Sequence, residues 1–107
     1  MATSKDMLEF IIDQLRDLDD IRTRSMMGEY VVYYQDKVIG LICDNQLFIK
    51  ETKAGRELLG SVHEESPYEG AKKMFVVDIE NRKLLREVIE ASYPELPLPK
   101  PKKKKSV

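Results

Sequence analysis

The fold is decided by residues 30–50, YVVYYQDKVIGLICDNQLFIK, in which short runs rich in Val, Ile, Tyr and Phe alternate with turn residues. β-branched and aromatic residues favour strands, and polar residues between such runs are typical of consecutive hairpins. Strands are predicted near residues 30–34, 38–43 and 46–50, with turns at 35–37 and 44–45, and a further strand is predicted near 23–26. These turns are too short for parallel crossovers, so antiparallel pairing is expected.

A helix is predicted before this region. The segment Thr3-Ser4-Lys5-Asp6 offers a hydroxyl N-cap with an acid close behind it, and apolar residues at helical spacing follow. The helix is expected to run for about four turns. Acidic residues crowd its end, where the helix dipole disfavours negative charge, so it should stop near Leu18, with a turn at Asp19-Asp20.

Two more helices are predicted after residue 50. Residues 52–59 should form a short helix that ends at Gly60, although Gly55 inside it costs up to about 1 kcal/mol relative to alanine. A last helix has apolar residues at helical spacing from residue 84 to residue 92, with Asp78 or Asn81 as its cap and Pro94 at its end. Beyond Pro94 the chain is expected to be extended.

Between these helices, residues 61–72 have the polar composition of a long loop, and residues 74–77 form an apolar run suited to a buried strand. The predicted order is therefore helix, three or four strands, helix, strand, helix. This order predicts a two-layer α+β domain, with helices flanking an antiparallel sheet of four to five strands. Helices cannot hide both faces of a sheet at this size, so an open face or edge is expected to seek a partner.

The composition indicates one folded domain, residues 1–93, followed by a Pro- and Lys-rich tail, residues 94–107. With 107 residues, 42% hydrophobic and 35% charged, the chain can bury a single modest core. The single cysteine, Cys43, cannot form an internal disulfide, and a reducing cytoplasm is expected. The apolar runs are far shorter than the roughly 20 residues that cross a bilayer, so no membrane association is expected.

Charge divides the chain unevenly. Residues 1–93 hold 13 Lys or Arg against 18 Asp or Glu, whereas the tail is basic. An acidic body argues against a broad phosphate-binding face, because duplex binding depends on neutralising many phosphates. The alternative function is nucleic-acid association through four of the five tail lysines, which predicts affinity that falls steeply with salt and vanishes on truncation after Pro94. These residues are Lys102, Lys103, Lys104 and Lys105.

No catalytic or metal-binding constellation is predicted. His63 is the one histidine, and Glu64 and Glu65 beside it cannot converge with it on one ion. Cys43 is interpreted as a small strand residue, because Asp44 next to it would raise the pKa of the thiol. A further alternative is a small-molecule or enzymatic pocket between the sheet and the loop of residues 61–72, with His63, Tyr68 and Glu69 as its candidates.

Tyr30, Tyr33 and Tyr34, with Phe48, raise the question of a stacking platform for single-stranded nucleic acid. Such platforms pair exposed aromatic rings with basic residues, and this region offers few lysines among several acids. Alternating strand packing is the preferred interpretation of these tyrosines.

Several motifs, taken in order along the chain, resemble the N-terminal domain of the TfoX/Sxy family. That family commonly has Met-Phe-Gly-Gly where this chain has Met26-Met27-Gly28-Glu29, so Glu29 replaces the second glycine. The resemblance covers nearly all of residues 1–93. It is carried by residues 26–30 (Met26, Gly28, Glu29 and Tyr30 among them), the pairs Tyr33-Tyr34 and Ile39-Gly40, residues 47–50, and Pro67-Tyr68 ahead of Met74.

The resemblance implies a fold similar to secretion-chaperone-like domains, which are frequently dimers. Named members of the family are bacterial regulators of natural competence that act with the cyclic-AMP receptor protein, and they carry a second domain after this one. The family's motifs supply no catalytic residue, cofactor site or metal site that maps onto this chain. We therefore expect a non-enzymatic, cytoplasmic regulatory or protein-interaction module that forms a homodimer, in which Gly28 serves the backbone as a bulge or tight turn.

Overall fold

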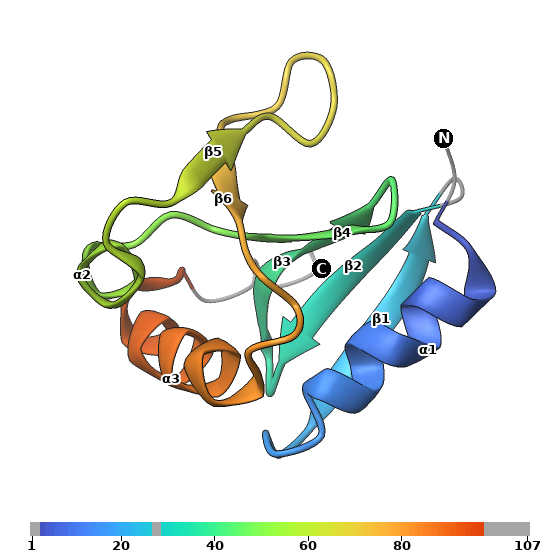
Figure 1. Cartoon of the computed structure of the whole chain (residues 1–107), viewed down its shortest axis with the longest axis horizontal. Helices are drawn as coiled ribbons and strands as arrows, with labels where there is room; N and C mark the ends of the chain where they lie inside the picture. Colours follow the sequence, from blue (N-terminus) through green and yellow to red (C-terminus); the bar gives the residue numbers. More distant parts are fainter. Residues whose placement is uncertain (1–2, 27–28, 98–107) are drawn as a thin grey trace, which may run out of the picture.

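The computed structural model describes residues 3–26 and 29–97; residues 1–2, 27–28 and 98–107 lie outside this description. The described elements are α1 (Lys5–Gln14), β1 (Ile21–Met26), β2 (Glu29–Tyr34), β3 (Lys37–Cys43), β4 (Gln46–Ile49), α2 (Lys53–Leu59), β5 (His63–Glu65), β6 (Met74–Val76), α3 (Arg82–Ser92) and a 3-10 turn (Tyr93–Glu95). The predicted α+β class is confirmed, with the helices flanking one antiparallel sheet (Figure 1).

Within the described residues the sheet has six strands in the order β1-β2-β3-β4-β6-β5, and each neighbouring pair is antiparallel. The first four strands form the predicted series of hairpins. Asp44 and Asn45 both have positive φ, 53° and 62°, and so form the two-residue type I′ turn that matches the twist of a hairpin. Gln35, at φ 59°, begins the turn between β2 and β3.

A bulge in β3 sets the register of the central strands. Val32 pairs with Gly40 and Tyr33 with Val38, so Ile39 is the extra residue, and its side chain is fully buried. Gly40 next to it lies so close to β4 that a Cβ atom there would be 1.9 Å from the carbonyl oxygen of Phe48. The glycine of the Ile39-Gly40 pair is therefore required by the close approach of two backbones.

The prediction of one continuous loop over residues 61–72 is wrong, because residues 63–65 form β5 at the edge of the sheet. His63, Glu64 and Glu65 have no strand-like composition, and they become a strand by pairing with residues 74–76 of β6. Glu64 also accepts hydrogen bonds from Arg56 of α2 at 3.1 and 3.3 Å. The sheet thus has six strands rather than the four to five predicted.

The first helix begins as predicted but ends earlier. Ser4 is its N-cap, and its hydroxyl accepts from the backbone N–H of Met7 at 3.1 Å. The helix ends at Gln14 instead of near Leu18. Tight turns follow, which place Leu15 and Leu18 in the core at 1% and 6% exposure.

The last two helices pack against each other on the same side of the sheet as α1 (Figure 1). Thr52 caps α2 through its hydroxyl, and Asn81, one of the two predicted caps, accepts from the backbone N–H of Leu84. Residues of α1 and α3 share one buried cluster with alternate residues of the sheet, including Val32, Leu47 and Phe75. No helix in the described part of the chain is long and apolar enough to span a membrane.

Residues 93–97 continue to contact the body after α3 ends. They form a 3-10 turn at Tyr93–Glu95 where an extended chain was predicted beyond Pro94. The Glu95 carboxylate accepts from the backbone N–H groups of Lys53 and Ala54 at 2.8 Å each, and Leu96 is buried in the main core. Residues 98–107 of the predicted tail, with all five of its lysines, lie outside the described residues.

Candidate functional site

The face of the sheet away from the helices carries the candidate site. Strand pairing places Leu41 of β3 next to Phe48 of β4, and Phe48 next to Val76 of β6, so these side chains share this face. Cys43, Phe48 and Met74 form a second buried cluster here, against which Leu41 and Val76 pack. This open face is therefore partly apolar.

The connection between β5 and β6 crosses one end of the open face and forms one wall of a groove. Its Pro67 and Tyr68 line two adjoining cavities of about 510 and 730 Å³, which also share Met26 and Leu41. Met26 is 46% exposed and Tyr68 56% exposed, and the informative point is that the two large side chains line the same cavities. We call the surface formed by Met26, Leu41, Pro67 and Tyr68 the apolar groove.

Four residues of the predicted family motifs lie at this groove. Met26 ends β1 and Glu29 begins β2, so the two residues follow the first strand of the sheet, which starts at Ile21. Pro67 and Tyr68 meet them from the opposite wall. Met74 begins β6 and is buried under the same face, whereas Tyr30 packs against the main core on the other face. Met27 and Gly28 lie outside the described residues, so the expected backbone role of Gly28 remains a prediction.

Glu29, the departure from the family's double glycine, has a defined position. Its carboxylate accepts from the hydroxyl of Thr3 at 3.2 Å and from the backbone N–H of Asp44 at 3.3 Å. It thereby joins the start of the chain to the β3–β4 turn at the mouth of the groove.

Cys43 is held in the wall of the groove and is not poised for chemistry. Its thiol donates to the carbonyl oxygen of Pro67 at 3.3 Å, and the residue is buried. Burial of the thiol is the main cause that raises its pKa, and the carboxylates of Glu29 and Asp44 raise this pKa further. A reactive thiol needs the opposite setting, with a lowered pKa and access to solvent.

The structure does not bring together the three residues of the predicted enzymatic pocket. Tyr68 lines the groove, but His63 and Glu69 do not. His63 is on edge strand β5 with its side chain 65% exposed, and its Nε2 lies 3.2 Å from Glu65. Glu64 points to the other face, toward Arg56. Within residues 3–26 and 29–97, no group of three or more His, Cys, Asp or Glu side chains could hold a metal ion.

The tyrosines of β2 do not form a common platform. Tyr30 and Tyr34 pack into the main core, where the Tyr34 ring meets that of Tyr93 edge to face at 5.4 Å. Tyr33 pairs with Val38 and Arg22 and faces the open side. Phe48 is only 2% exposed. Alternation of faces along β2 thus separates these rings, as the packing interpretation requires.

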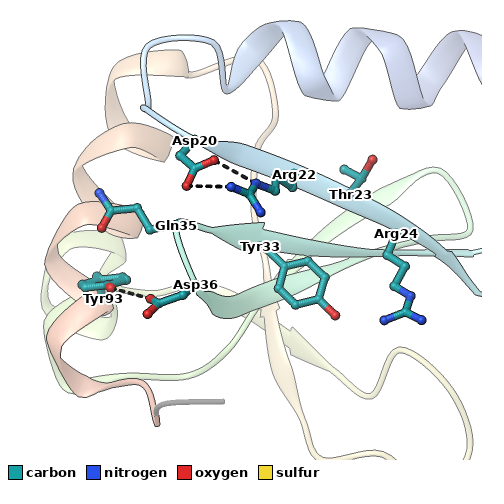
Figure 2. A pocket seen from close by; sticks show the side chains of 8 residues that line it. All are labelled: Asp20, Arg22, Thr23, Arg24, Tyr33, Gln35, Asp36 and Tyr93. Carbon is teal, nitrogen blue, oxygen red and sulfur yellow. Dashed lines mark hydrogen bonds and ion pairs between the residues drawn. The ribbon is translucent and has the colours of Figure 1, made fainter. Parts of the chain in front are cut away.

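A second hollow, which sequence reasoning missed, lies beside β1 at the far edge of the same face. It is a shallow pocket of about 740 Å³ whose lining includes Arg22, Arg24 and Tyr33 (Figure 2). Asp20 pairs with Arg22 at 2.9 Å, and Asp36 accepts from the hydroxyl of Tyr93 at 2.8 Å. The sequence signal for this pocket is two arginines spaced by two residues on a strand, which places both on one face.

Comparison with known proteins gives the family of this chain. The family model described as the TfoX N-terminal domain matches residues 13–97. The chain belongs to this family. It is also 36% identical over 108 residues to an uncharacterised 12.7 kDa protein encoded in the trpE 5′ region of Spirochaeta aurantia, and the match covers 99% of this chain and 94% of that protein. No solved structure matches this TfoX-like chain.

Proposed function

We propose that this TfoX-like chain is a non-enzymatic regulatory module that acts through protein contacts in the cytoplasm, and that its apolar groove is the contact surface. The observation that carries the proposal is the groove itself. Met26 and Tyr68 expose large apolar side chains on the sheet face that the helices leave uncovered. Contiguous exposed apolar surface of this kind commonly marks a protein interface, and Met and Tyr are enriched in such interfaces.

Membership of the TfoX N-terminal domain family supports a regulatory role, and a link to transcriptional or competence regulation is part of the proposal. The chemistry of the face supports contact with protein over catalysis. The thiol of Cys43 is buried and hydrogen-bonded, and His63 lies apart from Tyr68. We propose that the first occupant of the groove is a second copy of this chain, which would cover Met26 and Tyr68 in a homodimer.

Molar mass in solution tests this proposal. We expect the wild type to run as a dimer in size-exclusion chromatography with light scattering, and Met26→Asp to run as a monomer, because a carboxylate cannot be buried in an apolar interface without a partner. Leu58→Asp is the matched control, since Leu58 is 42% exposed on α2 and lies outside the groove. A wild type that remains monomeric at 0.1 mM or above, as an order-of-magnitude threshold for weak dimers, would contradict the homodimer.

A cellular experiment tests the regulatory part. Transcript levels in the native cell are compared between a strain with the gene deleted, the same strain complemented with wild type, and one complemented with Met26→Asp. We expect the deletion to change a defined set of transcripts that wild type restores and Met26→Asp does not. Restoration by Met26→Asp at equal protein level would show that the groove is not the regulatory surface.

A further inference from the structure

Strand β1 is an edge that the fold leaves open. It ends the strand order, and among the described residues no strand pairs with its outer side. It runs for six residues, Ile21–Met26, whereas β5 at the opposite edge has three. A free edge of this length presents unpaired backbone N–H and C=O groups, which can accept a further strand from another chain.

The side chains along this edge are basic within an acidic body. Arg22 and Arg24 project on the open face, where they flank Tyr33 in the shallow pocket (Figure 2). Arg22 is already paired with Asp20 at 2.9 Å. Arg24 is exposed and makes no ion pair with any residue in the part of the chain that the structure describes. The guanidinium of Arg24 is therefore available for an added carboxylate, which it can bind through two parallel hydrogen bonds.

Charge argues against a second copy of this chain at this edge. If two β1 strands paired antiparallel, residues directly opposite would share a face. A register centred on Thr23 sets Arg22 opposite Arg24 twice, and a register centred on Arg24 sets that arginine opposite itself. Like charges directly opposite destabilise such a pairing, whereas an acidic strand would be attracted.

A nucleic acid fits this edge less well than a peptide. Single-stranded nucleic acid needs several stacking rings and a basic track. This pocket offers two rings, Tyr33 and Tyr93, and also holds the carboxylates of Asp20 and Asp36. An extended peptide uses what the edge does offer, because backbone pairing supplies affinity and a pocket for alternate side chains supplies specificity.

We infer that β1 binds an extended acidic segment of a partner protein, which adds to the sheet as a further strand and places a carboxylate on Arg24 beside Tyr33. The inference deepens the proposed protein-interaction function and rests on it, and the edge adjoins the apolar groove at Met26, the last residue of β1. Because adjacent residues of a strand alternate in direction, every second residue of the segment faces the pocket. The segment should therefore carry Asp or Glu at alternate positions.

The test uses the full chain and a fluorescein-labelled probe peptide, Thr-Val-Glu-Val-Glu-Val-Thr, with binding followed by fluorescence anisotropy. We expect Arg24→Glu to weaken binding at least about tenfold, as the loss of a charge-assisted hydrogen bond predicts. Arg86→Glu makes the same charge change on an exposed position of α3 and should leave the affinity within about twofold. A probe with lysine in place of glutamate should prefer Arg24→Glu over wild type.

A second probe separates strand addition from simple charge attraction. It has the same sequence with alternate backbone nitrogens methylated on the pairing side, which keeps both carboxylates but removes the strand hydrogen bonds. We expect this probe to lose at least about tenfold in affinity. Equal binding of the methylated and parent probes would refute strand addition, and equal effects of Arg24→Glu and Arg86→Glu would refute the assignment to Arg24.

Other outcomes also decide the matter. The inference is overturned if the parent probe does not bind at millimolar concentration. It is also overturned if a fluorescein-labelled oligothymidylate binds the wild type more tightly than the parent probe does and Arg24→Glu abolishes that binding. The two experiments have different readouts, because the molar mass of the wild type reports the homodimer, whereas probe binding by the wild type and by Arg24→Glu reports the edge. A dimer without probe binding refutes the edge alone, and probe binding by a monomer refutes the homodimer alone.

Discussion

Replacement of Gly55 by alanine is the substitution for which sequence and structure predict opposite signs. By helix propensity alone, alanine inside α2 should stabilise the protein by about 1 kcal/mol. In the structure, however, Gly55 is buried where α2 meets α3, and an added Cβ would lie 2.8 Å from Thr52 Oγ1, 3.1 Å from Phe75 Cε2 and 3.2 Å from Ser92 Oγ. The methyl group therefore has no free space.

The cost follows from what must move. Overpacking a well-packed site by one methyl group costs about 1–3 kcal/mol. The Thr52 hydroxyl accepts from the Gly55 N–H at 2.9 Å and shares a buried hydrogen bond of 2.7 Å with Ser92, and disturbing such bonds costs about 1 kcal/mol more. After subtraction of the propensity gain, we expect Gly55→Ala to lower the free energy of unfolding by about 1–3 kcal/mol.

Urea unfolding monitored by circular dichroism measures this change, with the midpoint and the slope fitted separately. Glu57 is exposed on the same helix. The difference in unfolding free energy between Glu57→Ala and Glu57→Gly therefore reports the helix propensity of alanine over glycine in α2, without any change in buried packing. Ser92→Ala removes one of the three crowding atoms, and the Gly55→Ala penalty should shrink by about 0.5 kcal/mol or more in that background. A Gly55→Ala variant as stable as wild type, or more stable, would refute the packing argument.

Three further predictions concern single groups. Lys37→Met should lower the free energy of unfolding, measured in urea, by about 1–3 kcal/mol. The substitution removes a hydrogen bond of 3.0 Å from the Lys37 Nζ to the carbonyl oxygen of Tyr93, and a contact of 4.2 Å between that Nζ and the centre of the Tyr93 ring. An unchanged urea midpoint would contradict this prediction. Hydrogen bonds from the backbone N–H groups of Ala54 and Lys53 lower the pKa of Glu95, so the ionised carboxylate stabilises the fold above its ordinary pKa of about 4.3, and this stabilisation is lost as the pH falls. Glu95→Gln should therefore melt at a lower temperature than wild type at pH 7, and the melting temperatures of the two proteins should converge in acid. The pKa of the Cys43 thiol is raised, so the neutral thiol stabilises the folded state below the ordinary pKa of about 8.5, and this stabilisation is lost as the pH rises. Alkylation of Cys43 by iodoacetamide at pH 8 should be much slower in the folded protein than in urea, and equal rates would contradict the burial of the thiol.

Local patterns predicted the elements whose formation depends on neighbouring residues. The series of hairpins from β1 to β4, with the turn at Asp44-Asn45, follows from strand composition and turn chemistry. The caps Ser4 and Asn81 and the end of α2 at Gly60 follow from hydrogen-bonding groups within a few positions. These features are local because a cap or a two-residue turn is completed by the residues next to it.

Elements that depend on distant partners were missed or misplaced. Residues 63–65 become β5 because β6 offers them an edge, and nothing in the polar triplet His63-Glu64-Glu65 indicates a strand. The end of α1 at Gln14 reflects contacts across the fold, since the Gln14 side chain donates to the carbonyl of Ile79 at 2.7 Å and the turns beyond it bury Leu18. Such contacts join residues far apart in the sequence, and no periodicity records them.

The amino-acid sequence by itself determined that this chain is a small α+β domain of the TfoX type with an acidic body. Tertiary structure alone decided which motif residues face outward together. Met26 and Tyr68 are 42 positions apart and meet at one groove, while Arg24 and Tyr33 meet at one edge. The physical reason is that strand alternation assigns each side chain to a face, but strand order and the position of the β5–β6 connection determine its neighbours.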